Sequence, residues 1–443
     1  IFGVEAARVE KDLLAMLCAL EEEREKRLSM EDGEEIVLTA EDEKLGMELL
    51  ESPELFDRIT SDLAALGYVG EDVNKQLLYL AASSRKLDDP MSVIVLSESA
   101  SGKSFLVDTV KKLIPPEDVV SMTSLSDQAL NYLPAEGLLH KFLVMGEAVH
   151  GEVVEHQVRE MLSAKELSRL VTTKDEKTGE LTSRMVRKQV IVSAVMSSTN
   201  YDLNAENASR CFVVNTDESV QQTRNIHRIQ RQKYSLQRYK SKKEQLPSII
   251  TAHHAAQRLL KLRVIVNPFA DLLDFPSSMM RARRDHERFI DLIAAVCFLR
   301  QYQKEEHEAE GVHYIECDLE DYQVAHRIMT AVLPSTLTNF PKSALRLYSE
   351  VRKILKKKAE REELGVTEAS VSQREIREAT DFNQRFIKRY MKVLCDFEYL
   401  KAGGMRTRGS RNLYSLVADE EIRMVDMSMV PTPEEMREKL KNV

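Results

Sequence analysis

The sequence contains no tryptophan, only five cysteines, and few residues that break regular structure. Its 443 residues include 15 Gly and 12 Pro, which excludes collagen-like and Pro/Gly-rich disordered chains. No apolar run approaches the roughly 18 residues that a membrane-spanning helix needs, and no basic start followed by an apolar stretch marks a signal peptide. We therefore expect a globular protein of two or three domains that is not in a membrane. Because the first residue is Ile1 rather than Met, we expect the chain to be a fragment of a longer protein.

The cysteines lie far apart in the sequence, with no close pair: Cys18, Cys211, Cys297, Cys317 and Cys395. That spacing supports neither a zinc site nor a disulfide framework, and it is typical of a reducing compartment. The predicted location is the cytoplasm.

The net charge of the chain is −9, but the charges are unevenly distributed along the sequence. Residues 1–60 carry 18 acidic and 7 basic side chains, a net charge of −11. Residues 342–417 carry 18 basic and 10 acidic side chains, a net charge of +8. Since a phosphate backbone responds to the local field, nucleic acid remains a candidate partner for this C-terminal region.

The period of the apolar residues changes along the chain. Helical spacing predicts helices up to about residue 84, and short apolar runs then predict buried strands at 92–96, 141–145, 190–195 and 211–214. Helical segments alternate with these strands, which indicates an α/β fold with a parallel sheet. After residue 217 the chain returns to helices, including a basic stretch from 224 to 243.

The first predicted strand leads into a loop that resembles a phosphate-binding loop, with Ser97 in place of its first glycine. Backbone N–H groups and a helix N-terminus would bind the phosphates of ATP, Lys103 would reach the β- and γ-phosphates, and Ser104 would ligate Mg²⁺. A small-residue turn with an incidental lysine is the alternative. The predicted nucleotide-binding residues are Ser99, Ala100, Ser101, Gly102, Lys103, Ser104 and Phe105.

Polar residues follow the later strands. Glu147 comes after the second strand, where it would polarise the attacking water and share Mg²⁺ with Ser104, although Gly146 stands where an aspartate usually helps to bind the metal. Asn200 after the third strand is a candidate sensor of the γ-phosphate, and Arg210 before the fourth could reach a neighbouring subunit's nucleotide. The alternatives are a helix cap for Glu147, a turn residue for Asn200 and a surface ion pair for Arg210.

Residues 342–417 predict a winged helix, with a capping box at residues 372–375 and a recognition helix over 383–397. Basic residues on one face of that helix and around the tip of the following hairpin are predicted to contact DNA, although such modules also bind proteins. These residues are Arg385, Lys388, Arg389, Lys392, Arg406, Arg408 and Arg411.

Together these segments resemble an AAA+ ATPase of the MCM-like branch, in which a Ser-Arg-Phe-type segment follows the sensor asparagine, as in residues 209–212 here. The resemblance implies a hairpin over 170–184 that projects into a channel, with Lys174 and Lys177 as DNA contacts. It also implies a sensor arginine at Arg284, with Arg283 as the near alternative. An exposed hairpin and an exposed helix end are the alternatives.

A closer resemblance, over about residues 70–420, is to the ATPase region of primase-helicases from phages and integrative elements, on segments that include 71–90, 97–104, 222–228 and 267–284. In that family the first loop position tolerates serine and the acidic strand lacks its aspartate. The resemblance implies a primase domain or subunit as a partner.

The expected organisation is an acidic helical segment (1–75), an AAA+ α/β ATPase core (76–222), a helical lid (223–340), a winged helix (341–417) and a tail (418–443). The predicted function is a DNA helicase or translocase that acts as a homo-oligomeric ring, a hexamer by resemblance, with ATP and Mg²⁺ at subunit interfaces. The alternatives are an ATP-switched DNA-binding initiator or loader with slow hydrolysis, and a regulatory ATPase whose winged helix binds protein.

Overall fold

The computed structural model describes residues 38–123, 130, 135–146, 152–174, 181–199, 209–232, 234–275, 282–338, 342–396, 399–403, 413–419 and 429–441. Several predicted site residues lie outside this description: Glu147, Lys177, Asn200, Arg406, Arg408 and Arg411. The predicted first helix and the side chain of Lys174 lie outside it as well.

Five parallel strands form the central sheet, in the order β2-β3-β6-β1-β7. Their bounds are Val93–Leu96 (β1), Val119–Met122 (β2), Leu139–Met145 (β3), Ile191–Ser198 (β6) and Phe212–Val214 (β7). The predicted α/β fold with a parallel sheet is confirmed. Sequence reasoning missed β2, because this edge strand has four residues that are only partly buried and lacks the continuous apolar run of a central strand.

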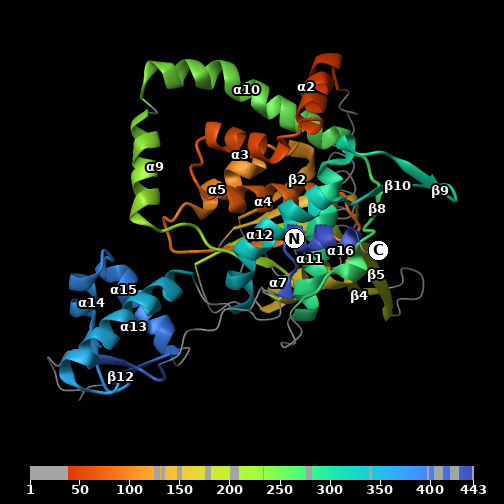
Figure 1. Ribbon diagram of the computed structural model, residues 1–443. Coiled ribbons are helices and arrows are strands. Elements are labelled where there is room, and N and C mark those ends of the chain that lie inside the picture. The colour runs from red at the N-terminus through yellow and green to blue at the C-terminus, as the bar shows by residue number, and fades with distance from the viewer. Residues whose placement is uncertain are drawn as a thin grey trace, which may run out of the picture.

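In the described part of the chain, three helices precede the sheet: α2 (Ala40–Leu50), α3 (Leu55–Ala65) and α4 (Asp72–Ser84) (Figure 1). Helix α4 packs on β6 and on the lid helices, α3 packs on α4, and α2 packs on α10. Their apolar faces, including Leu49, Ile59 and Leu63, belong to the main core cluster. At Gly46 a Cβ atom would lie 2.8 Å from the backbone nitrogen of Ala256 in α10, so α2 and α10 approach too closely for any side chain there. The apolar residues of these helices therefore pack into the same core as the sheet.

Two further helices flank the sheet strands, α5 (Lys103–Lys111) and α7 (Glu152–Ala164). After α7 come β4 (Glu166–Lys174) and β5 (Leu181–Gln189), which pair as an antiparallel hairpin with residue 174 opposite residue 181. The predicted hairpin therefore has longer strands than expected, and Lys174 is the last residue of its first strand. At about 3.4 Å per residue each strand is roughly 30 Å long.

The lid contains α9 (Val220–Gln232), α10 (Leu236–Leu259), α11 (Ala282–Leu299) and α12 (Leu319–Thr338). It also contains a small sheet in the order β8-β10-β9, formed by Val264–Val266, Val312–Glu316 and His307–Ala309, which the predicted all-helical lid did not include. These strands have three to five residues and alternate little, so no period marks them in the sequence.

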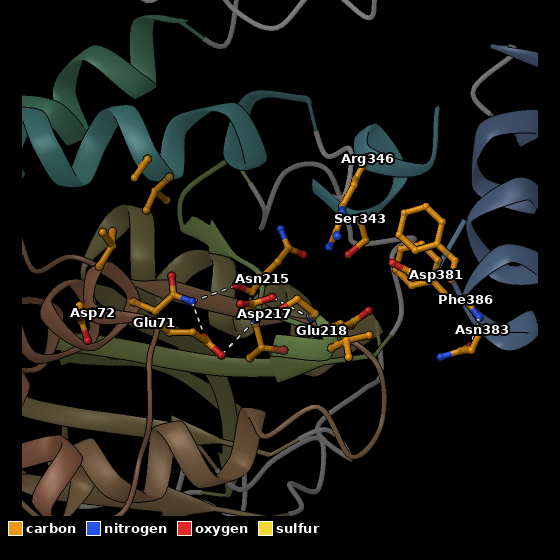
Figure 2. Close-up of a pocket in the computed structure, with 18 residues that line it drawn as sticks. Glu71, Asp72, Asn215, Asp217, Glu218, Ser343, Arg346, Asp381, Asn383 and Phe386 are labelled. Atoms are coloured by element: carbon orange, nitrogen blue, oxygen red, sulfur yellow. Dashed lines mark hydrogen bonds between the residues drawn. The ribbon is translucent and has the colours of Figure 1, made fainter. Parts of the chain in front are cut away.

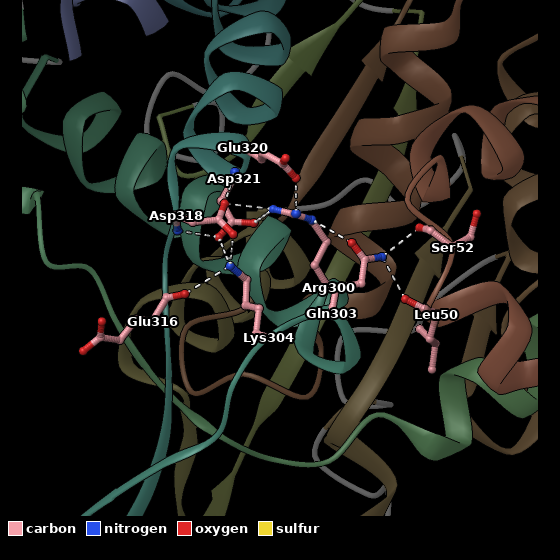
Figure 3. A network of polar contacts seen from close by, with 9 residues as sticks. All are labelled: Leu50, Ser52, Arg300, Gln303, Lys304, Glu316, Asp318, Glu320 and Asp321. Carbon is pink, nitrogen blue, oxygen red and sulfur yellow. Dashed lines mark hydrogen bonds and ion pairs between the residues drawn. The ribbon is translucent and has the colours of Figure 1, made fainter. Parts of the chain in front are cut away.

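A polar network joins the lid to the N-terminal helices (Figure 3). Arg300 and Lys304, after α11, form ion pairs with Asp318 (2.9 and 2.7 Å) and with Asp321 (both 2.6 Å), at the start of α12. Gln303 donates to two backbone carbonyls at the end of α2 and just beyond it (2.8 and 2.9 Å). Each buried charge thus has a partner of opposite sign, which is what makes such burial tolerable.

The winged helix has its own core and its own three-stranded sheet, in the order β11-β13-β12. It contains α13 (Lys342–Glu362), β11 (Val371–Ser372), α14 (Gln373–Ala379), α15 (Gln384–Asp396), β12 (Leu400–Gly403) and β13 (Leu413–Leu416). The capping box at Ser372 and Glu375 is confirmed, with both of its hydrogen bonds present.

The predicted tail contains α16 (Pro433–Lys441), which packs on α12. Val430 and Met436 are buried in the main core cluster, and the Tyr322 hydroxyl donates to the carbonyl of Pro431 at 2.5 Å. Residues 429–441 are therefore an integral part of the ATPase core, and the chain returns to that core after the winged helix. Among the described residues, no helix is long and apolar enough to cross a membrane.

Candidate nucleotide site

The loop between β1 and α5 has the backbone of a phosphate-binding loop. Ala100 (φ 65°) and Gly102 (φ 100°) are in the left-handed region, and nothing lies within 4 Å of a Cβ placed on Gly102. Glycine is therefore needed at residue 102 for its backbone angle and not for space. No side chain caps the N-terminus of α5, so its first N–H groups are available to an anion.

Lys103 lies over the loop. Its side chain is buried, and the ammonium donates to the carbonyl oxygens of Ser97 and Glu98, both at 2.7 Å. A positive charge is thus fixed at the mouth of the loop, where a triphosphate would offer it stronger acceptors than carbonyls. Ser104, in the first turn of α5, is exposed, so its hydroxyl is accessible to a Mg²⁺ ion.

Ser97, which replaces the first glycine of the loop, is fully buried and hydrogen-bonded on two sides. Its hydroxyl donates to the carbonyl of Leu96 and accepts the N–H of Thr216 at 2.7 Å. The serine therefore ties the loop to the segment that follows β7. The sequence offers no signal for this role, because Thr216 lies 119 residues further along the chain.

Ser101 offers a test of whether a nucleotide fits. Its hydroxyl oxygen is buried and has no hydrogen-bond partner, and a buried hydroxyl without a partner is costly unless a ligand supplies one. Together with the uncapped helix and the Lys103 ammonium, this orphaned hydroxyl fits a phosphate group bound in the loop.

Replacing Ser101 with alanine is therefore expected to leave the melting temperature of the nucleotide-free protein unchanged or slightly higher. The same change should weaken ATP binding about tenfold, the scale of one lost hydrogen bond to a charged group. Titration with a fluorescent ATP analogue measures the affinity. Ser61→Ala, which removes a satisfied hydroxyl on α3, is the matched control, and equal affinities for the two variants would contradict the assignment.

The strands that precede the predicted catalytic residues end at the same edge of the sheet as the loop. β3 ends at Met145 and β6 at Ser198, and Ser198 lies opposite Leu96 in the register. Gly146 donates its N–H to the carbonyl of Met122 at 2.9 Å, and a Cβ there would meet only ordinary contacts. Nothing in the structure explains why glycine replaces aspartate at this position.

Two predicted catalytic arginines, Arg210 and Arg284, lie together at the other end of the strands, where the strands begin. Arg284, near the start of α11, donates to the hydroxyl of Ser209, and Arg210 donates to that of Ser163 at the end of α7. Sequence reasoning missed Arg288, one turn along α11, which is largely buried and donates to the carbonyl of Ser209 at 2.8 Å. It positions the segment that carries Arg210.

The register gives the separation between these arginines and the loop. Phe212 pairs with Val93, so Arg210 is level with Met91, six residues (97 − 91) before the loop begins at Ser97. At about 3.3 Å per residue this is roughly 20 Å. Arg210 therefore cannot contact a nucleotide bound in its own loop.

Arg210, Arg284 and Asp291 line one cavity of about 280 Å³ at this end of the strands. Burial, together with the charges of Asp89 and Glu287, raises the pKa of Asp291 to about 7, against the effect of Lys165 and Arg288. Because the ordinary pKa is 3.8, the folded state binds a proton between pH 4 and 7 that the unfolded state has released. This carboxyl group therefore lowers the stability of the protein as the pH rises from 4 to 7.

Asp291→Asn removes that penalty, so the variant should unfold at a higher temperature than the wild type at pH 8 and at the same temperature near pH 4. Partial solvent exposure reduces the expected gain to about 2 kcal/mol. Thermal melts at the two pH values measure it, and Glu308→Gln at an exposed position of β9 is the control. A gain that does not depend on pH would contradict the assignment.

A second cavity, of about 370 Å³, lies between the ATPase core and the winged helix (Figure 2). Its lining is acidic, with Glu71, Asp217 and Glu218 from the core and Asp381 from the winged helix. Glu218 also accepts the backbone N–H of Glu98 at 3.2 Å. One lining residue of the cavity therefore contacts the phosphate loop.

The predicted DNA-binding residues on α15 differ in their surroundings. Arg385, Lys388 and Lys392 are exposed, as predicted for one face of a recognition helix. Arg389 belongs to the same face but forms an ion pair with Glu98 of the phosphate loop at 2.7 Å. It therefore contacts the ATPase core of its own chain and is only partly exposed.

Among the described residues, one group of His, Cys and acidic side chains is close enough to share a metal ion: Cys297, Cys317 and Asp321, within 4.8 Å of one another. The carboxylate of Asp321 already binds Arg300 and Lys304, both at 2.6 Å. Because two fixed cations occupy it, we assign no metal to this group.

A comparison with protein families agrees with the geometry of the loop and sheet. Residues 46–254 match the family described as the MTBMA_p00010 P-loop domain. A search of curated proteins gives no match. One similar solved structure is a full-length MCM homologue from Methanopyrus kandleri, with 11% identity and a TM-score of 0.42, over 68% of this chain and 63% of that one.

The family match, the parallel five-stranded sheet and the loop define residues 46–254 as a P-loop NTPase domain. Such domains bind nucleoside triphosphates, typically with Mg²⁺. The chain spans less than two thirds of the MCM homologue's length, and that likeness is too weak to support a conclusion about activity.

Proposed function

We propose that the protein is an ATPase of the AAA+ type that assembles into a ring and moves along DNA. The observation that carries this proposal is the position of Arg210 and Arg284, together at the end of the strands opposite the phosphate loop. Since the two arginines lie away from the phosphate loop of their own subunit, we propose that they stabilise the γ-phosphate bound by a neighbouring subunit. When that contact repeats around a closed ring, every subunit provides its arginines to one neighbour and receives arginines from the other.

Two further elements support DNA as the substrate. The strands of the β4–β5 hairpin are roughly 30 Å long, with residue 174 at the end of the first, and a hairpin of this length could reach DNA in the channel of a ring. The exposed basic residues Arg385, Lys388 and Lys392 on α15 suit contacts with duplex phosphates. Hydrolysis at the subunit interfaces would move the hairpins along one strand. A hexamer, a role in the replication of a mobile element and a primase partner remain predictions.

The ATPase rate as a function of single-stranded DNA concentration, followed by strand displacement on a forked duplex, tests the proposal. A DNA-driven motor shows stimulated hydrolysis and separates the fork. Stimulation or ATP binding without strand displacement would favour the loader, in which Gly146 keeps hydrolysis slow. A measurable ATPase rate that no DNA changes would contradict the motor and favour the regulatory ATPase whose winged helix binds protein.

A further inference from the structure

The winged helix and the ATPase core have separate hydrophobic clusters, and polar contacts join them. These contacts come from α15, the predicted recognition helix. A surface that is expected to face DNA therefore also faces the nucleotide loop of the same chain.

Arg389 makes two of these contacts. Its guanidinium forms an ion pair with Glu98 at 2.7 Å and donates to the carbonyl of Thr199, just after β6, at 3.3 Å. One side chain thus joins the phosphate loop to the end of the strand that precedes the predicted sensor. Both partners of the ion pair are largely shielded, with 24% of the Arg389 side chain and 34% of the Glu98 side chain exposed.

The neighbouring residue on α15 completes the network. The hydroxyl of Tyr390 donates to Glu218 at 3.1 Å, and Glu218 accepts the N–H of Glu98 at 3.2 Å. Figure 2 shows Glu218 on the core side of the cavity and Phe386 of α15 on the other. The recognition helix is therefore fastened to the loop through two acidic residues.

The charges explain why this contact forms. Burial raises the pKa of Glu218, and the nearby charge of Glu98 raises it further, while Arg389 opposes both effects. Two carboxylates beside a triphosphate site repel each other and the ligand, and Arg389 is a cation that neutralises them. Arg389 lies on the same face of α15 as the exposed residues Arg385, Lys388 and Lys392, because these residues are three or four positions apart. It is the member of this basic face that forms an ion pair with the core.

We propose that the phosphate loop and duplex DNA compete for Arg389. The inference rests on the proposed DNA binding of the winged helix and extends it: DNA can recruit this arginine only when α15 leaves Glu98 and Thr199. Because coupling between two sites is reciprocal, any change at the loop that weakens the Glu98 contact strengthens DNA binding by the module. DNA binding in turn frees the loop from α15.

Glu98→Gln in the full chain tests this competition. A partly exposed ion pair contributes little free energy. The release of Arg389 is therefore expected to raise the affinity for a labelled duplex by only about threefold. The salt dependence should also steepen by about 0.9 in the slope of log K against log [salt], because one more phosphate is neutralised. Fluorescence anisotropy between 50 and 200 mM salt measures both quantities.

Two controls isolate the coupling. Glu117→Gln removes the same charge and breaks a comparable ion pair, with Arg258 at 2.8 Å, so it should leave the affinity and the slope unchanged. Arg389→Gln should weaken binding slightly, and Glu98→Gln in that background should then have no effect.

The outcomes separate this inference from the proposed function. If the wild type binds duplex DNA and Glu98→Gln matches it in affinity and slope, the competition is refuted while DNA binding stands. An effect of Glu98→Gln that persists without Arg389 would refute it as well. If no variant binds duplex DNA, the DNA-binding role of the winged helix fails, and the inference fails with it.

Discussion

Lys103→Ala is expected to lower the ATPase rate at least about a hundredfold, the scale on which one preorganised charged group acts on a developing transition state. Lys103 is the cation that the loop itself provides, fixed by the carbonyls of Ser97 and Glu98. When a triphosphate binds, its oxygens replace these carbonyls as acceptors. Phosphate release at saturating ATP, with and without single-stranded DNA, measures the effect.

The loss of Lys103 also leaves two carbonyl groups without a donor, which costs about 1–3 kcal/mol. A control must therefore reproduce this cost without touching the loop. Lys86 provides it, because its ammonium also donates to two backbone carbonyls, of Gln257 and Leu260, at 2.7 and 2.8 Å. If Lys86→Ala lowers the melting temperature equally but hydrolyses ATP normally, the loss in Lys103→Ala is catalytic. Equal losses of activity would assign it to folding.

The parallel sheet and the loop could be predicted from the sequence because their signals are local. Apolar runs such as residues 92–96 are typical of buried parallel strands, and Gly102-Lys103-Ser104 after such a run indicates a phosphate site. The same holds for the capping box at Ser372, which involves residues only three apart. The winged helix follows from such patterns almost completely.

The contacts that join distant segments could not be predicted, because no pattern in a single sequence records them. Ser97 meets Thr216, and Arg389 meets Glu98, across 119 and 291 residues (389 − 98). The packing of α2 and α4 could not be predicted for a related reason. Their charged residues indicated an acidic helical segment, while their apolar positions pack on helices more than 150 residues away.

Arg210→Ala is expected to lower the ATPase rate about a thousandfold, with little change in ATP affinity, because an arginine that completes the site from a neighbour acts on the transition state. Within its own subunit Arg210 donates to the hydroxyl of Ser163, so thermal melts are needed to separate any loss of stability from the loss of rate. Arg258→Ala, which breaks an ion pair elsewhere, is the control. Steady-state kinetics separates the effect on kcat from that on KM.

A mixing experiment then decides whether Arg210 acts between subunits. Lys103→Ala subunits keep the arginine and Arg210→Ala subunits keep the loop, so each protein alone is inactive. In rings assembled from equal amounts of both, about one quarter of the interfaces combine an intact loop with an intact arginine. Activity should therefore reappear on mixing and rise with the extent of subunit exchange, which labelled subunits report. An inactive mixture with proven exchange would show that the arginine does not complete a neighbour's site, and the ring mechanism would lose its main support.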